Sequence, residues 1–285
     1  MKTLLAIINR PEESKSFIKY AANLAIDLKL KLHLIFVQNP EAYPLGAPGT
    51  TGTMTVEIQK GLEEMAENAQ KSIEELTKEV KSEIDKDLAT DVTTEVGVPK
   101  FIVEELVDED KVHMVIVDSK EDVSFWEQNS NNMDIIYDVN CPVWVIPFES
   151  VYKPYNKVVY ATNYKEEDIN TLKQLVSLTK PYNPEIVALH ITDSTEFEEK
   201  VKTTGFSDTV KSKTGYEKIA VEALLERKND NVSELINDYS KDIDANLITV
   251  LKENRHFLER LFKSSATKKL IKEAQLPVLV FHEKE

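Results

Sequence analysis

Residues 244–282 read DANLITVLKENRHFLERLFKSSATKKLIKEAQLPVLVFH, with an apolar segment near each end and a polar segment between them. The apolar segments, Leu247–Leu251 and Pro277–Phe281, have the length and composition of buried strands, and a helix that ends near Ala274 is predicted between them. The same order occurs in residues 111–147, and the two copies align at Cys141-Pro-Val-Trp-Val-Ile and Leu276-Pro-Val-Leu-Val-Phe. The sequence therefore predicts a tandem repeat of one domain.

The rest of the chain supports the same division. Strands are predicted at 3–9, 32–37, 91–96, 112–117 and 143–146 in the first half, and at 157–162, 185–191, 219–224, 247–251 and 277–281 in the second. Helices are predicted at 11–28, 56–87, 99–107, 131–137, 166–179, from about 195, and at 232–239. Apolar strands that alternate with helices are typical of a parallel sheet covered on both faces. We therefore expect two α/β, Rossmann-like domains, 1–149 and 155–285, each with a five-stranded, mostly parallel sheet.

The two copies differ most in their middle. Residues 38–55 hold three glycines and three prolines, which predicts a long surface loop that is functional or mobile. Val37 aligns with Ile191 and Pro142 with Pro277, so the second copy is 19 residues shorter between those points. We expect that it lacks this loop and has a shorter second helix.

Charge and composition exclude several classes of protein. The formal net charge is −15, which argues against a nucleic-acid partner. No apolar run is long enough to span a membrane, and Leu4–Ile8 is too short for a signal peptide, so a cytoplasmic location is expected. Cys141 is the only cysteine and the five histidines are scattered, so neither a disulfide nor a metal site is predicted.

The charge is divided unevenly between the two copies. Residues 1–150 contain 14 basic and 28 acidic residues, whereas the remaining residues contain 21 and 22. The connector and last helix of the second copy are basic, with Lys252, Arg255, Arg260, Lys263, Lys268, Lys269 and Lys272. The same region of the first copy carries Asp118, Glu121, Asp122 and Glu127.

Candidate ligand-binding residues follow from the expected fold, because open α/β sheets bind ligands at the carboxyl ends of their strands. The first-copy candidates are Asn9, Val37, Asn129 and Ser130, and the second-copy candidates are Asn163, Ile191, Lys263, Ser264, Ser265 and Lys268. Ser264 and Ser265 also fit a helix cap. Cys141 fits a packing residue, and His190 a structural residue at the end of a strand.

The order of short motifs in both copies resembles that of the universal stress protein family. The motifs are Leu4-Leu-Ala-Ile-Ile-Asn9 with Pro11-Glu-Glu-Ser, Gly97-Val-Pro99, Cys141-Pro-Val-Trp-Val, Tyr160-Ala-Thr-Asn163, Ala188-Leu-His-Ile191, and Phe257-Leu-Glu-Arg-Leu-Phe with Ser264-Ser265. The resemblance implies an adenine nucleotide alpha hydrolase-like fold and a role in the stress response. We also expect self-association through the last strands, near Val143 and Val278, as an intramolecular pseudo-dimer, because Val143–Ile146 and Val278–Phe281 are candidate pairing edges.

The nucleotide-binding branch of that family resembles G-x2-G-x9-G-(S/T) in the connector, with an acidic residue after the first strand. This chain has no glycine in 118–130 or 251–265, and the acidic position is Asn9 in one copy and Asn163 in the other. Without glycine, the connector cannot easily bring its backbone close to a phosphate. Binding of ATP or another adenine nucleotide is therefore expected to be weak or lost.

Three functional hypotheses remain open. The first is a non-enzymatic stress-response protein that acts through protein partners. The second is a nucleotide or anion sensor in which Lys252, Arg255, Lys263 and Lys268 replace the glycine amides. The third is a nucleotide-dependent α/β enzyme, but the chain has neither a Walker motif nor a recognisable catalytic triad motif.

Overall fold

The computed structural model describes residues 2–39, 52–84, 86–109, 111–119, 135–136, 139–194, 197–227, 232–252 and 276–282. The chain divides into two compact units, which are described separately. The first consists of Met1–Val143 and Phe148–Tyr152, and the second of Trp144–Pro147 and Lys153–Glu285. The domain limits 1–149 and 155–285 stay predictions.

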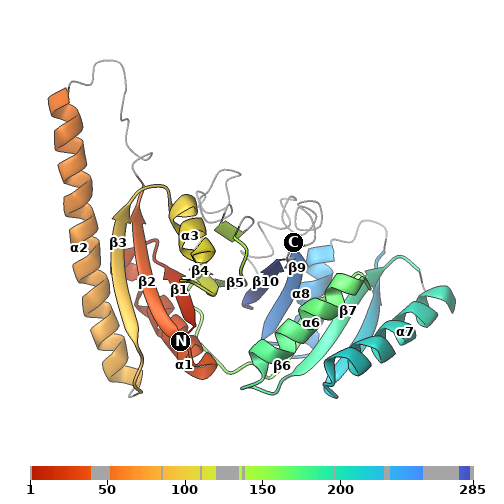
Figure 1. Ribbon diagram of the computed structural model, residues 1–285. Coiled ribbons are helices and arrows are strands. Elements are labelled where there is room, and N and C mark those ends of the chain that lie inside the picture. The colour runs from red at the N-terminus through yellow and green to blue at the C-terminus, as the bar shows by residue number, and fades with distance from the viewer. Residues whose placement is uncertain are drawn as a thin grey trace. The chain divides into compact units, whose positions relative to one another are not determined.

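The first unit contains a parallel sheet. Its strands are β1 (Thr3–Ile7), β2 (Lys31–Gln38), β3 (Thr90–Val96) and β4 (Met114–Asp118), in the spatial order β3-β2-β1-β4 (Figure 1). Each neighbouring pair is parallel. Every residue of β1 after Thr3 is buried, as expected for a central strand covered on both faces.

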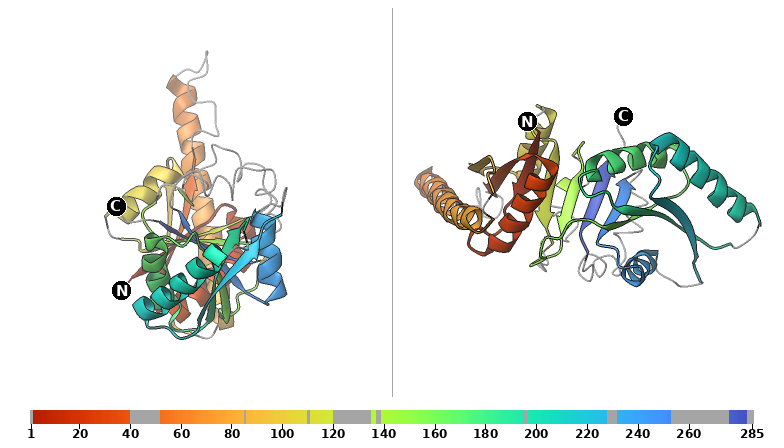
Figure 2. Two further views of the ribbon diagram at one scale, coloured as in Figure 1. Left: turned by 90° about the vertical axis from the view of Figure 1, so that its right-hand side faces the viewer. Right: turned by 90° about the horizontal axis from the view of Figure 1, so that it is seen from below.

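Helices cover both faces of this sheet. They are a 3-10 turn η1 (Pro11–Glu13), α1 (Lys15–Leu28), α2 (Gly52–Ile84) and α3 (Pro99–Asp108). α1 and α2 pack together on one face, and α3 lies on the other (Figures 1 and 2). This is the arrangement that right-handed crossovers give when the strand order reverses between β2-β1 and β4.

The second unit repeats this plan. Its strands are β6 (Lys157–Ala161), β7 (Glu185–Thr192), β8 (Ile219–Leu225), β9 (Leu247–Lys252) and β10 (Val278–His282), in the order β10-β9-β6-β7-β8 with all pairs parallel. Its helices are α6 (Glu166–Thr179) and α7 (Phe197–Thr214) on one face and α8 (Val232–Asp242) on the other (Figures 1 and 2). Strand β5 (Val143–Ile146) lies at the junction of the two units in the chain. The predicted α/β fold is confirmed.

In each unit, aromatic side chains pack against the segment of chain that joins the two repeats. Tyr152 donates a 2.6 Å hydrogen bond to Asp27 on α1, and its ring meets that of Tyr20 edge-on at 5.2 Å. In the second unit, Tyr155 is 1% exposed and stacks on Trp144 with a centroid distance of 5.2 Å. The segment between the two predicted domains is therefore held by aromatic packing near both of its ends.

The second helices of the two repeats differ as predicted. α2 has 33 residues, whereas α7 has 18. The predicted start of the first helix at Pro11 is wrong by a turn. Pro11–Glu13 forms η1, the Ser14 hydroxyl donates to the Pro11 carbonyl at 2.8 Å, and α1 begins when the Ile18 amide bonds to the Ser14 carbonyl.

Two further predictions concern the membrane and the Gly/Pro-rich segment. No helix in the described part of the chain is long and apolar enough to cross a membrane. The predicted 38–55 loop is too long at both ends, because Gln38 belongs to β2 and residues 52–55 belong to α2; residues 40–51 lie outside the described residues. The last helices predicted for both repeats also lie outside them, apart from Ile135 and Ile136.

Candidate ligand-binding site

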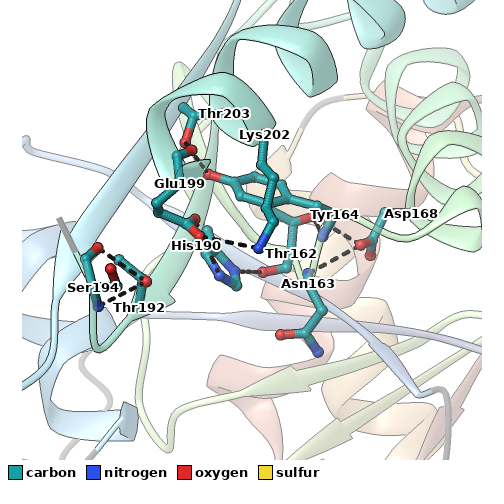
Figure 3. A network of polar contacts seen from close by, with 10 residues as sticks. All are labelled: Thr162, Asn163, Tyr164, Asp168, His190, Thr192, Ser194, Glu199, Lys202 and Thr203. Carbon is teal, nitrogen blue, oxygen red and sulfur yellow. Dashed lines mark hydrogen bonds and ion pairs between the residues drawn. The ribbon is translucent and has the colours of Figure 1, made fainter. Parts of the chain in front are cut away.

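The carboxyl ends of the strands in the second unit carry a connected set of polar and aromatic side chains (Figure 3). They come from the turn after β6, the first turn of α6, the end of β7, the residues just after it, and the first turns of α7. In this unit the strand order reverses between β6 and β9, and an open parallel sheet binds ligands beside such a reversal. This edge is therefore the candidate site.

Asp168 fixes the turn between β6 and α6. Its side chain is 1% exposed, and its Oδ1 accepts a 2.6 Å hydrogen bond from the Tyr160 hydroxyl. Its Oδ2 accepts hydrogen bonds from the Thr162 hydroxyl at 2.8 Å and from the amides of Asn163 and Lys165, each at 3.0 Å. A buried carboxylate needs such donors to offset its lost hydration. Asp168 therefore caps α6 and sets the direction in which the turn leaves the sheet.

The turn directs Tyr164 back over the end of β7. Tyr164 has a φ of 60°, in the left-handed region that is unfavourable for a residue with a side chain, and its amide donates to the Thr162 hydroxyl at 3.0 Å. Its ring lies 4.3 Å from that of His190 and 5.0 Å from that of Phe206, between centroids. Its hydroxyl is 2.9 Å from that of Thr203 on α7. The Tyr164 ring thus fills the space between the β6 turn, β7 and α7 (Figure 3).

The surroundings of Tyr164 affect its titration. Burial raises the pKa of the Tyr164 hydroxyl, the hydrogen bond with Thr203 opposes this shift, and the negative charge of Glu199 adds to it. The phenol therefore stays neutral to a higher pH than a free tyrosine does.

His190 connects Tyr164 to a carboxylate on α7. The His190 Nδ1 atom is 2.8 Å from the Thr162 carbonyl oxygen, and because a carbonyl can only accept, Nδ1 carries the proton. The other ring nitrogen, Nε2, lies 3.7 Å from Oε1 of Glu199, an ion-pair distance when the imidazole is protonated. The Glu199 side chain is 12% exposed, and its Oε2 lies 3.9 Å from the Lys202 ammonium. Oε1 of Glu199 is buried and has no hydrogen-bond partner within the described ranges, so it faces His190 without a hydrogen bond.

The equivalent edge of the first unit has different chemistry. The side-chain amide of Asn9 donates a 3.4 Å hydrogen bond to Oδ1 of Asp118. This bond lies where the strand order reverses between β1 and β4. Ser14 occupies the sequence position that Asp168 has in the second repeat, and Ala6 that of Tyr160. The first repeat therefore has no counterpart of the Asp168 and Tyr160 hydrogen bond, and it places a carboxylate at the mouth of its candidate site.

The structure brings together only some of the predicted site residues. Asn163 is exposed beside the Asp168 turn, Ile191 follows His190 at the end of β7, and Val37 is 9% exposed at the end of β2. The other predicted residues, Asn129, Ser130, Lys263, Ser264, Ser265 and Lys268, lie outside the described residues. A phosphate subsite at the last helices thus stays a prediction.

Sequence reasoning missed Tyr164, Asp168 and Glu199, and it gave His190 no partner. One signal was present for Asp168. Tyr160 stands in an otherwise apolar strand, and a buried tyrosine hydroxyl needs an acceptor, for which the helix that follows offers Glu166, Glu167 and Asp168. No comparable signal marks the contact of Tyr164 with His190, because it depends on the path of α7.

Two further observations concern metal ligands and the single cysteine. No group of three or more histidine, cysteine, aspartate or glutamate side chains in the described ranges is placed to hold a metal ion. Cys141 is 6% exposed, and burial raises the pKa of its thiol to about 12, so it is a neutral packing residue at physiological pH.

Solved structures with the same fold cover nearly the whole chain. A universal stress protein from Archaeoglobus fulgidus DSM 4304 has 16% sequence identity and a TM-score of 0.64, covering 99% of this chain and 97% of its own. A putative universal stress protein from Pseudomonas aeruginosa UCBPP-PA14 has 13% identity and a TM-score of 0.60, with 99% and 93% covered. The cytoplasmic domain of a prokaryotic cation chloride cotransporter has 10% identity and a TM-score of 0.51, with 98% and 94% covered. At these identities the likeness concerns the fold alone.

Sequence comparison gives the family directly. No curated protein matches the sequence at a significant level. The profile of the universal stress protein family, however, matches residues 1–147 and again residues 154–282, one match for each repeat. The two matches together span almost all of the 285 residues. The chain therefore belongs to the universal stress protein family and carries two copies of the family's domain in tandem.

Proposed function

We propose that this protein is a non-enzymatic, cytoplasmic stress-response protein whose two repeats hold adenine nucleotides weakly or not at all. It acts through protein contacts, including self-association at the last strands near Val143 and Val278. One observation supports weak nucleotide binding most directly. The aromatic ring of Tyr164 already lies against His190 at the ligand-binding edge of the second unit.

The Tyr164 contacts make its removal from the site costly. A base bound against His190 and Phe206 would have to displace a ring that packs on both and is held by a 2.9 Å hydrogen bond to Thr203. The free energy of that displacement would be subtracted from any binding free energy. This supports weak binding at the second unit.

The first unit supports the same proposal by its charge. Asp118 lies at the reversal of strand order, within 3.4 Å of the Asn9 amide. The segment that follows adds Glu121, Asp122 and Glu127, and contains no glycine. A triphosphate at this edge would meet like charge and a backbone that cannot easily approach it.

The test is thermal unfolding of the full chain with ATP, ADP and AMP at millimolar concentration. A ligand at 100 times its dissociation constant would add about 2.7 kcal/mol to the free energy of unfolding, a shift of several degrees. We expect no such shift for the wild type. We expect Tyr164→Ala to bind a nucleotide more tightly than the wild type, whereas the control Tyr239→Ala, which removes another hydrogen-bonded tyrosine, should not.

Two outcomes would replace the proposal. A wild-type shift with ATP that disappears in Lys263→Glu/Lys268→Glu would establish the sensor hypothesis, which the basic composition of residues 252–272 favours. Turnover of a nucleotide in the presence of a divalent metal would establish an enzyme. Both are measured on the same purified protein.

A further inference from the structure

The outer strand of the second sheet, β8, combines an apolar sequence with an exposed surface. It reads IAVEALL, yet Ile219 is its one buried residue, and Leu225 is 44% exposed. Strand β9, which is as apolar, is buried along its length up to the last residue. Apolar surface that stays in water contributes nothing to stability. Helix α7 packs against β8, yet the strand keeps exposed apolar positions that a further contact could bury.

Within the described ranges, no strand pairs with the outer edge of β8. It pairs with β7 through consecutive residues from Ile186↔Ile219 to Thr192↔Leu225, with no bulge, and it ends the strand order of its sheet. Edge strands are usually protected by lysine, proline, bulges or a covering element. β8 has one charged residue, Glu222, and none of the other features within its bounds.

The first repeat provides an internal comparison. Its outer strand, β3, reads TDVTTEV, in which polar residues predominate, and the long helix α2 packs along it (Figure 1). The equivalent helix α7 buries only Phe206 and Val210, while its Phe197 is 81% exposed and its Val201 51%. Because α7 packs along β8 as α2 packs along β3, the two outer strands differ in composition rather than in cover: the second repeat has an apolar outer strand where the first has a polar one.

We propose that β8 is a self-association surface, which pairs antiparallel with β8 of a second copy of this chain. A two-fold axis pairs an edge with itself in the antiparallel direction and satisfies both free edges at once. The charges favour this half of the molecule for the contact, because residues 151–285 carry 21 basic and 22 acidic residues, whereas residues 1–150 carry 14 and 28. Like-charge repulsion between two chains is therefore weaker at their second repeats than at their first.

The sequence of β8 also restricts the register of this pairing. A register centred on Glu222 would place two carboxylates directly opposite each other, which is destabilising. Registers centred on Val221 or Ala223 keep side chains on matching faces and avoid this pair. Of the registers that avoid it, these two are centred nearest the middle of Ile219–Leu225 and therefore pair the most residues, so one of them is expected.

The first experiment is sedimentation velocity of the full chain over a concentration series up to about 100 µM, where a dimer with a micromolar dissociation constant is populated. The wild type should show a reversible dimer. Ala220→Lys/Ala223→Lys should raise the dissociation constant at least about tenfold, because lysine on an edge disfavours strand addition. The control is Val96→Lys on the outer strand β3 of the first repeat. Val96 is 44% exposed, as Leu225 on β8 is, and its substitution should leave the dimer unchanged. Circular dichroism and the melting temperature establish that each variant is folded.

Crosslinking determines the register. Either Val221→Cys or Ala223→Cys should give a disulfide-linked dimer on mild oxidation, and Val96→Cys should not. The native Cys141 adds little background, since it is 6% exposed and burial raises its thiol pKa to about 12. A wild type that is monomeric at the highest concentration, or a dimer that the lysine variants do not weaken, would overturn the proposal.

Discussion

At the scale of single residues, the second unit depends on a carboxylate that the first unit lacks. Asp168 is 1% exposed and accepts hydrogen bonds from two hydroxyls and two amides. The equivalent Ser14 makes one local bond, from its hydroxyl to the Pro11 carbonyl at 2.8 Å. The same turn is therefore held by a buried charge in one repeat and by a neutral side chain in the other.

This difference predicts unequal effects of two matched substitutions. Asp168→Ala leaves buried donors without an acceptor and should lower the free energy of unfolding by about 3–5 kcal/mol. Ser14→Ala removes one hydrogen bond and should cost about 1 kcal/mol. Urea unfolding, followed by circular dichroism, measures both. Equal losses would mean that the Asp168 hydrogen bonds do not hold the turn.

Tyr164 predicts a dependence of stability on alkaline pH. Its pKa is raised in the folded protein, first by burial, so its contribution to stability is complete below the ordinary tyrosine pKa of 10.0 and is lost as the pH rises through the folded value. Tyr164→Phe should remove this part of the alkaline decline, together with about 1 kcal/mol from the lost bond to Thr203. Melting curves from pH 8 to pH 11 (roughly the range that brackets tyrosine ionisation) compare the two proteins. If the melting temperatures of the wild type and Tyr164→Phe fell equally with pH above pH 10, the prediction would be wrong.

The residue-level contacts were less predictable from sequence than the strands that carry them. The runs at 157–162 and 185–191 predicted β6 and β7 to within one residue, because strands buried on both faces are continuously apolar. The contact of Tyr164 with His190 depends on a positive φ and on where α7 crosses the sheet. Neither is encoded in a local sequence pattern. The expected fold therefore predicted the edge of the sheet where the site lies, but not which side chains meet there.

At the scale of elements, α1 and α2 are joined by a row of ion pairs on the surface of the first unit. Lys15 contacts both Glu79 and Glu83, and Lys19 lies 2.6 Å from Glu83. The hydrogen bonds from Lys19 and Lys15 lower the pKa of Glu83 to about 2. The paired side chains are exposed to solvent, so each pair contributes little to the free energy of unfolding.

The direction of this pKa shift fixes the acid response of α2. A carboxyl whose pKa is depressed in the folded state contributes its stability above the unfolded value of 4.5 and loses it as the pH falls toward 2. Glu83→Gln should make the melting temperature less sensitive to pH across this window, by a small amount because the group is exposed. Raising the salt concentration should mimic the substitution. A pH profile identical to that of the wild type would show that the pairs do not persist in solution.

Helix lengths and strand edges show what sequence patterns can and cannot predict at this scale. The shorter second helix of the second repeat was predicted from the alignment of Val37 with Ile191 and Pro142 with Pro277, and α7 confirms it. The exposure of β8 was not predictable, because its apolar run is the same signal that a central strand gives. Only its position at the end of the strand order distinguishes the two cases.

At the scale of the whole molecule, the repeats have kept one fold and diverged in charge. Both match the universal stress protein family, but the net charge of −15 resides almost entirely in residues 1–150. Long-range repulsion between two chains therefore acts mainly between their first repeats, and it falls off over a Debye length of about 10 Å at 0.1 M salt. Association through β8 must work against this repulsion.

This balance predicts how self-association depends on salt. Raising the ionic strength from roughly 20 mM to roughly 300 mM shortens the Debye length severalfold, so the dimer dissociation constant should fall, by about three- to tenfold. Sedimentation velocity at both salt concentrations measures it, and Ala220→Lys/Ala223→Lys serves as the control because a non-specific loss of solubility would affect it equally. If the dimer weakened with salt instead, opposite charges would be holding it together. The contact would then lie between an acidic and a basic surface rather than between two apolar edges.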